Sequence, residues 1–202
     1  MKFILFILFS FLYIVAMSGQ NVFLEKQKGF KYKRLPVLDS LNIKEPDFKT
    51  LDVEIRVYCT KFDVDTINNS KFIQIVKDKN GSWSGKSCSY YFYNNFYYNY
   101  RDINIKYSSC ENWGKVWRII IKENYLNLPT ESDIKQENKP PVCVSDGTSY
   151  TVEILTKKRK RRISYNNPEE IYESCFEYGI DCCEYKLFLQ LIQLLKEGSE
   201  LL

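Results

Sequence analysis

The sequence contains no histidine among its 202 residues. Histidine is the usual general base near neutral pH, a member of most serine and cysteine hydrolase triads, and a common metal ligand. Its absence excludes these hydrolases and any imidazole metal site. An enzyme built from this chain would need paired carboxylates, a lysine base or a cysteine nucleophile, and nothing in the sequence marks a particular pair among the 25 acidic residues.

Long hydrophobic runs are also scarce, and the only one covers residues 3–16, after a charged start. Its 14 residues are fewer than the roughly 20 that a membrane-spanning helix needs. Ala16 and Ser18 are the small residues that a signal peptidase reads. The alternative is an uncleaved N-terminal anchor. We expect a signal peptide over residues 1–18, then an exported chain, periplasmic or secreted, with no transmembrane segment.

A large excess of one charge is missing as well. Without the first 18 residues, 28 basic residues stand against 25 acidic ones, and one run of six basic residues accounts for the positive balance. This distribution argues against a protein shaped to coat nucleic acid. The run consists of Lys157, Lys158, Arg159, Lys160, Arg161 and Arg162. It predicts either a solvated hairpin turn that protects strand edges, or a contact for a polyanion such as acidic polysaccharide, lipid phosphate or extracellular nucleic acid.

Alternating apolar and polar residues predict several strands that each bury one face. Asn80-Gly81 is a hairpin signal between two of them, and the basic run would form the tip of a second hairpin. The predicted strands cover residues 53–59, 71–77, 103–107, 150–155 and 163–165.

Apolar residues at helical spacing predict helices near residues 112–124, 168–178 and 182–197. The β-branched residues 119–121 leave a strand as the alternative for the first helix. Asn167, followed by Pro168 and Glu170, has the spacing of a capping box, and Gly179 suits the end of the same helix.

These elements together predict an α+β domain over residues 51–202. It would contain a mainly antiparallel sheet of five to seven strands, with about three helices packed on one face. Residues 19–50 have no sustained period, and we expect an extended lead-in there.

The segment 90–100 holds eight aromatic residues in eleven. Exposed aromatic rings can stack on sugars, so Tyr91, Tyr93, Tyr97 and Tyr98 are candidates for binding an envelope glycan. The alternative is a sheet with tyrosines on both faces, since tyrosine favours strands.

Seven cysteines in an exported chain predict one or two disulfides and at least one remaining thiol. The favoured pair is Cys88–Cys110, because these two residues lie on either side of one predicted strand, residues 103–107. Several cysteines could instead be small buried residues, and Cys59 shares the apolar phase of its strand. The spacing lacks the paired C-x-x-C units of zinc ribbons, so no metal or cofactor site is predicted.

Four short segments together resemble a known group of sequences. They are W-x3-W at residues 113–117, LNLP at 126–129, DGTSYTVE at 146–153 and YNNP at 165–168. This pattern is similar to that of a group of bacterial proteins that carry a signal peptide and have no known function. The resemblance covers roughly residues 50–195. It implies export, and it implies no activity, cofactor or binding residues.

The leading functional hypothesis is a non-catalytic exported protein that binds or scaffolds a partner at the cell envelope. The alternative is an exported hydrolase that uses a carboxylate pair. A deep pocket with two facing acids would favour the hydrolase, and a flat sheet face or an isolated basic tip would favour binding.

Overall fold

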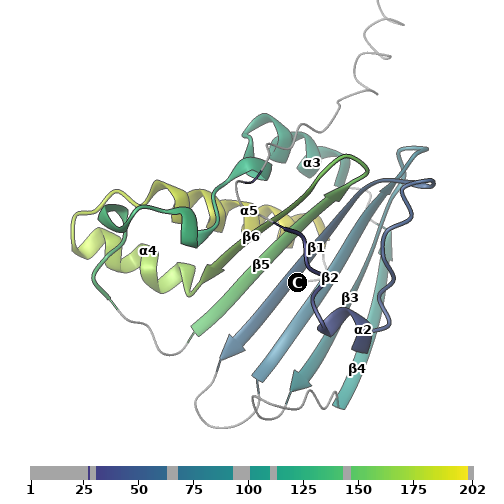
Figure 1. Cartoon of the computed structure of the whole chain (residues 1–202), viewed down its shortest axis with the longest axis horizontal. Coiled ribbons are helices and arrows are strands. Elements are labelled where there is room, and N and C mark those ends of the chain that lie inside the picture. Colours follow the sequence, from purple (N-terminus) through teal and green to yellow (C-terminus); the bar gives the residue numbers. More distant parts are fainter. Residues whose placement is uncertain are drawn as a thin grey trace, which may run out of the picture.

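A six-stranded antiparallel sheet dominates the computed structural model, which describes residue 27 and residues 31–62, 68–92, 101–109, 113–142 and 147–199 (Figure 1). The strand order is β4-β3-β2-β1-β5-β6. The strands are β1 (Leu51–Phe62), β2 (Asn68–Asp78), β3 (Trp83–Phe92), β4 (Arg101–Ser109), β5 (Gly147–Thr156) and β6 (Lys160–Asn166). The predicted sheet of five to seven mainly antiparallel strands is confirmed.

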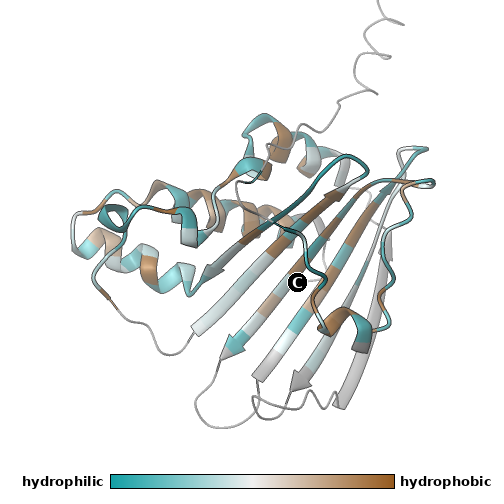
Figure 2. Ribbon diagram, viewed as in Figure 1, coloured by the Kyte–Doolittle hydropathy of each residue, from teal (hydrophilic) through white to brown (hydrophobic). Residues whose placement is uncertain are grey.

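The sheet is a meander of four strands followed by a hairpin that pairs with the first strand. β1 pairs with β2 on one side and with β5 on the other, so it lies near the centre. Hydrophobic and hydrophilic residues alternate along the central strands (Figure 2), as side chains on successive residues must point to opposite faces. Both predicted hairpins are confirmed, at the β2–β3 and the β5–β6 connections.

Three helices cover one face of the sheet, as predicted (Figure 1). Their buried residues form the main core with the apolar phase of β1, β2, β5 and β6. The helices are α3 (Trp113–Lys122), α4 (Pro168–Glu177) and α5 (Cys183–Ser199), and short 3₁₀ turns connect α3 to β5 at η1 (Tyr125–Asn127), η2 (Glu131–Asp133) and η3 (Gln136–Asn138). The five predicted core residues of the last helix are all buried: Tyr185, Phe188, Leu191, Ile192 and Leu195.

The segment with the β-branched run is a helix, because Trp113, Trp117 and Ile120 fall on its buried face. Trp83 of β3 packs on this face, with its ring centroid 5.9 Å from that of Trp113 and 5.4 Å from that of Trp117. Tertiary packing of one amphipathic face therefore outweighs the strand preference of residues 119–121.

The start of α4 differs from the prediction in its cap. Asn167 precedes Pro168 as expected, but its backbone is left-handed, with φ of 47°, and its side chain makes no capping hydrogen bond. The capping box is therefore not formed. The Asn167 side chain instead lies against Gly147, where an added Cβ would stand only 2.2 Å from Asn167 Oδ1. The backbone of Gly147 also has φ of +142°, so glycine is required there on both grounds.

A second, smaller core lies on the opposite face of the sheet. Residues 31–50, expected as an extended lead-in, contain the helical turn α2 (Val37–Ser40). This segment crosses the sheet face opposite the three long helices (Figure 1). Its buried side chains pack against β1, β2 and β3, and the cluster consists of Leu38, Leu41, Ile43, Tyr58, Phe72, Cys88 and Tyr90. Both faces of the central strands therefore carry packed side chains.

The outer edge of β6 is closed by side chains. Three alternate backbone N–H groups of this strand point away from β5, and each donates to a side-chain oxygen of another segment. Arg162 N donates to Gln27 Oε1, Ser164 N to Thr130 Oγ1, and Asn166 N to Glu131 Oε2, at 3.3, 3.0 and 2.9 Å. A peptide strand could not add to this edge without breaking these bonds.

Candidate functional site

The six basic residues split into two groups because they run through a hairpin turn into a strand. Lys157, Lys158 and Arg159 are exposed and lie between β5 and β6; we call them the basic tip. Thr156 N and Thr156 Oγ1 donate to Arg159 O at 2.9 and 2.8 Å, and Arg159 N donates back to Thr156 Oγ1 at 3.0 Å. The backbone of the tip is thus held by three hydrogen bonds.

The other three basic residues belong to β6 and alternate between its faces. Arg161 is buried on the helix side, where its Nη2 donates to Asn127 O at 2.9 Å and to Leu128 O at 2.6 Å. These carbonyls end the η1 turn, so Arg161 fixes the connector to the sheet. Lys160 and Arg162 point to the opposite face. They contact residues of the segment 31–50.

Lys160 and Arg162 hold the segment 31–50 in place. Lys160 Nζ lies 3.3 Å from Glu45 Oε2 and 4.0 Å from the centre of the Tyr32 ring, a cation–π arrangement. Arg162 Nη2 donates to Lys33 O at 2.6 Å. Three of the six residues predicted to bind a polyanion therefore contact other segments of the fold: Lys160, Arg161 and Arg162.

The basic tip shares one end of the sheet with other exposed lysines. The β5–β6 and β2–β3 hairpins turn at this end (Figure 1), and Lys49 and Lys79 are exposed there. Two acids at this end accept backbone N–H bonds: Asp47 Oδ1 from Lys49 N, and Asp78 Oδ1 from Ser82 N. Their negative charges lower the local positive potential. One oxygen of each carboxylate already accepts a backbone hydrogen bond.

Two buried carboxylates lie side by side beneath the segment 31–50. Glu54, Arg56, Glu153 and Arg162 form what we call the buried ion network, and Glu54, Arg56 and Glu153 are at most 1% exposed. Arg56 lies between the two acids: its Nε is 2.5 Å from Glu54 Oε1 and its Nη1 is 3.8 Å from Glu153 Oε2. Two acids and two arginines leave the network without net charge.

Each carboxylate of this network has several partners. Glu54 Oε1 also accepts from Gln74 Nε2 at 2.6 Å. Glu153 Oε1 accepts from Arg162 Nε at 2.9 Å, and its Oε2 accepts from Tyr58 OH at 3.0 Å. A carboxylate pair that hydrolyses a substrate must face space for that substrate and for water, whereas these acids are covered by residues 31–50 and bonded to arginines.

The ionisation of this network is shifted by burial and by charge. Burial and the charge of Glu153 raise the pKa of Tyr58 well above its ordinary value. Burial alone would lower the pKa of Arg56, but the charge and hydrogen bond of Glu54 raise it instead. Tyr58 therefore stays neutral and Arg56 stays charged over the physiological pH range.

The predicted Cys88–Cys110 disulfide is not formed. Cys88 is a buried free thiol in the smaller core, and burial raises its pKa to about 11. The β3–β4 register places Ser109 opposite Ser84, four residues from Cys88 and about 13 Å away along the strand, which does not favour this pairing. Cys110 lies outside the described residues.

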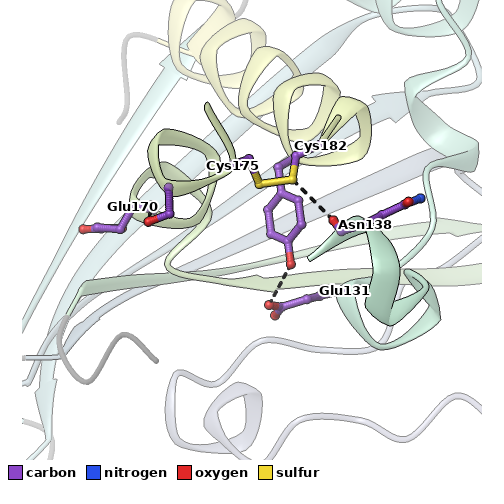
Figure 3. The surroundings of a disulfide bond; sticks show 7 residues. Glu131, Asn138, Glu170, Cys175 and Cys182 are labelled. Atoms are coloured by element: carbon purple, nitrogen blue, oxygen red, sulfur yellow. Dashed lines mark hydrogen bonds between the residues drawn. A yellow bond between two sulfur atoms is a disulfide. The ribbon is translucent and has the colours of Figure 1, made fainter. Parts of the chain in front are cut away.

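The observed disulfide joins Cys175 and Cys182, with Cα atoms 6.1 Å apart. It links the end of α4 to the start of α5 (Figure 3). One of the one or two predicted bridges is present among the described residues, and its pairing was missed because sequence spacing does not fix connectivity. Cys59 is a partly buried free thiol and Cys183 an exposed one.

The aromatic candidates fall almost entirely outside the described part of the chain. Tyr93, Tyr97 and Tyr98 lie outside it, and of Tyr91 only the backbone, at the end of β3, is described. The glycan-stacking surface stays a prediction.

No protein-family model and no curated protein matches the chain. Across the described ranges, none of the helices has the length and hydrophobicity to cross a bilayer. In the same ranges, no three acidic or cysteine side chains come together as a metal ion would require.

Proposed function

We propose that this chain is an exported, non-catalytic binding protein that contacts polyanions through the basic tip, Lys157, Lys158 and Arg159. The observation that carries the proposal is the exposure of the basic tip. Lys157, Lys158 and Arg159 are exposed on a turn whose backbone is fixed by hydrogen bonds, whereas the three basic residues of β6 contact other segments. A fixed turn presents its charges with little loss of backbone entropy on binding.

Export is supported by the leader-like N-terminus, by the resemblance to bacterial proteins with signal peptides, and by the Cys175–Cys182 bridge. Disulfides form and persist mainly in oxidising compartments. The partner in such a compartment would be an acidic polysaccharide, a lipid phosphate or extracellular nucleic acid, all of which present repeated negative charges.

The buried carboxylates do not supply a site for the alternative, a carboxylate hydrolase. Glu54 and Glu153 lie on neighbouring strands, and both are buried and bonded to arginine. Binding through the surface therefore fits the geometry better than catalysis does.

Heparin chromatography of the purified chain tests the proposal. The triple variant Lys157→Ser, Lys158→Ser, Arg159→Ser should elute at clearly lower salt than the unaltered chain, because up to about three fewer counterions are released on binding. A matched control removes three exposed charges from α3 through Lys115→Ser, Arg118→Ser and Lys122→Ser, and should change retention much less. Equal losses of retention in the two variants, or no loss in the first, would contradict the proposal.

A further inference from the structure

The corner between α4 and α5 is a rigid, open depression of about 570 Å³. α4 ends in a Schellman motif: Ile180 N donates to Cys175 O at 2.9 Å, and Gly179 N donates to Phe176 O at 3.2 Å. Gly179 has the left-handed backbone, φ of +66°, that this motif requires. The disulfide then fixes the two helices to each other (Figure 3), so the walls of the depression are pre-formed.

Part of the lining of this depression is apolar. Cys175, Cys182, Ile180 and Phe176 line it, and the Phe176 side chain is 90% exposed. Tyr178, in the same turn, is 54% exposed. In the described part of the chain only one other large hydrophobic residue, Ile119 on α3, is exposed to a comparable degree. Exposed aromatic residues gathered at a pre-formed hollow are typical of a contact surface.

The charge at this corner is negative. Glu173, Glu177 and Asp181 line the depression, against one basic residue, Lys186. Within the described ranges none of these three carboxylates makes an ion pair or a side-chain hydrogen bond. A second copy presenting the same face would bring like charges together. Charge complementarity instead selects a positively charged occupant.

We propose that the α4–α5 corner docks a cationic segment of a partner polypeptide, which inserts an apolar side chain beside the disulfide. Phe176 would pack on that side chain, and the three carboxylates would pair with flanking lysines or arginines. An apolar anchor with a charged surround is the usual arrangement of small recognition surfaces. This site is separate from the basic tip and is independent of the proposed polyanion contact.

The exposed thiol of Cys183 lines the same depression and can report its occupancy. The test measures the rate at which iodoacetamide alkylates Cys183 in the purified chain, by mass spectrometry of the peptide that contains it. Cys59, a partly buried thiol of β1 that does not line this depression, serves as the internal control. The probe is the peptide Lys-Lys-Phe-Lys-Lys, blocked at both ends. Control peptides replace the lysines by glutamate or the phenylalanine by serine.

The lysine–phenylalanine peptide should slow alkylation of Cys183 at least fivefold at saturation and leave Cys59 unchanged, and the control peptides should not slow it. Phe176→Ser should abolish the protection, whereas Ile119→Ser, a matched change of an exposed apolar residue on α3, should keep it. Because both side chains are exposed, both variants should fold, which circular dichroism checks.

Equal protection by all three peptides, or none by the first, would overturn the proposal. Protection without peptide that grows with protein concentration would also overturn it, because it would identify a second copy of the chain as the occupant.

Discussion

Arg56 is the residue on which the buried ion network depends. It contacts both buried acids and donates to Lys44 O at 3.1 Å, so it also fixes the segment 31–50 to β1. Buried ion pairs add little net stability over apolar residues, but removing one partner leaves an uncompensated buried charge. The consequence of losing Arg56 should therefore be large.

We expect Arg56→Ala to lower the free energy of unfolding by about 3–5 kcal/mol, measured by urea denaturation. The control is Lys122→Ala on α3, whose partner Glu123 is 3.4 Å away and whose side chain is 83% exposed. Removing such a surface pair should change stability by less than about 0.5 kcal/mol. Similar effects in the two variants would show that the network does not stabilise the fold.

The Cys88 thiol predicts a pH dependence with a definite sign. Burial raises its pKa to about 11 in the folded chain, against roughly 8.5 for an unfolded cysteine. The folded chain therefore holds more protons above pH 8.5, and the free energy of unfolding falls as pH rises. Between pH 7 and pH 10 the Cys88 thiol should lower the free energy of unfolding by about 2 kcal/mol.

Urea denaturation of the unaltered chain and of Cys88→Ala at these two pH values measures that cost. Cys88→Ala should be less stable than the unaltered chain at pH 7, because the thiol no longer packs in the core. Between pH 7 and pH 10, however, its free energy of unfolding should fall by about 2 kcal/mol less than that of the unaltered chain. If the free energy of unfolding fell by the same amount in both proteins, the pKa of the Cys88 thiol would not be raised in the folded chain.

At the level of elements, β6 is a short edge strand that depends on its side-chain contacts. Thr130 Oγ1 donates to Ser164 O and accepts from Ser164 N, both at 3.0 Å. Thr130→Val keeps the shape and removes both bonds, which should cost about 1–3 kcal/mol. Hydrogen exchange of the Ser164 amide should accelerate, while the Ile163 amide, which faces β5, should change little.

Thr50→Val is the control for this change, because the Thr50 hydroxyl donates an exposed hydrogen bond to Asp47 O. It should alter stability by less than about 0.5 kcal/mol. An unchanged Ser164 exchange rate in Thr130→Val would show that the edge is protected by other means.

Most elements could be predicted from the sequence because their local signals agree with their packing. β1, β5 and α5 combine a clear period with the burial that the period implies. The buried ion network could not be predicted in this way. Glu54 and Arg56 occupy the polar phase of β1, which period alone assigns to solvent, and only the distant segment 31–50 covers them. Opposite charges at paired positions, Arg56 with Glu153 and Glu153 with Arg162, were the available signal.

The candidate site was predicted only in part, for a related reason. The basic run was identified, but alternation along β6 assigns Arg161 to the helix side and Arg162 to the network. Charge composition counts all six residues, whereas pairing geometry decides which of them meet solvent. The disulfide was mispaired because connectivity follows from helix geometry that spacing does not encode.

At the scale of the whole molecule, the folded unit begins before β1. Residues 31–50 supply Leu38, Leu41 and Ile43 to the smaller core, each at most 6% exposed. Fully burying such a side chain is worth about 1.5–3 kcal/mol. Domains of this size are stable by only about 5–15 kcal/mol in total.

A chain that begins at Asp47 should therefore be less stable by more than about 4 kcal/mol, and limited proteolysis should digest it faster. A chain that begins at Gln27 should retain the stability of the full chain, since it keeps every contact that the structure describes for the smaller core. If both shortened chains unfolded at the same urea concentration, residues 31–46 would not belong to the folded unit.

The closed edge of β6 limits how copies of this sheet could join. With Gln27, Thr130 and Glu131 occupying its outward N–H groups, backbone pairing between the described sheets would have to use the β4 side. Two sheets that met there would form a single continuous ribbon of finite width and stop at two copies. Endless cross-β growth requires two open edges per molecule, so this arrangement would resist fibre formation at high local concentration.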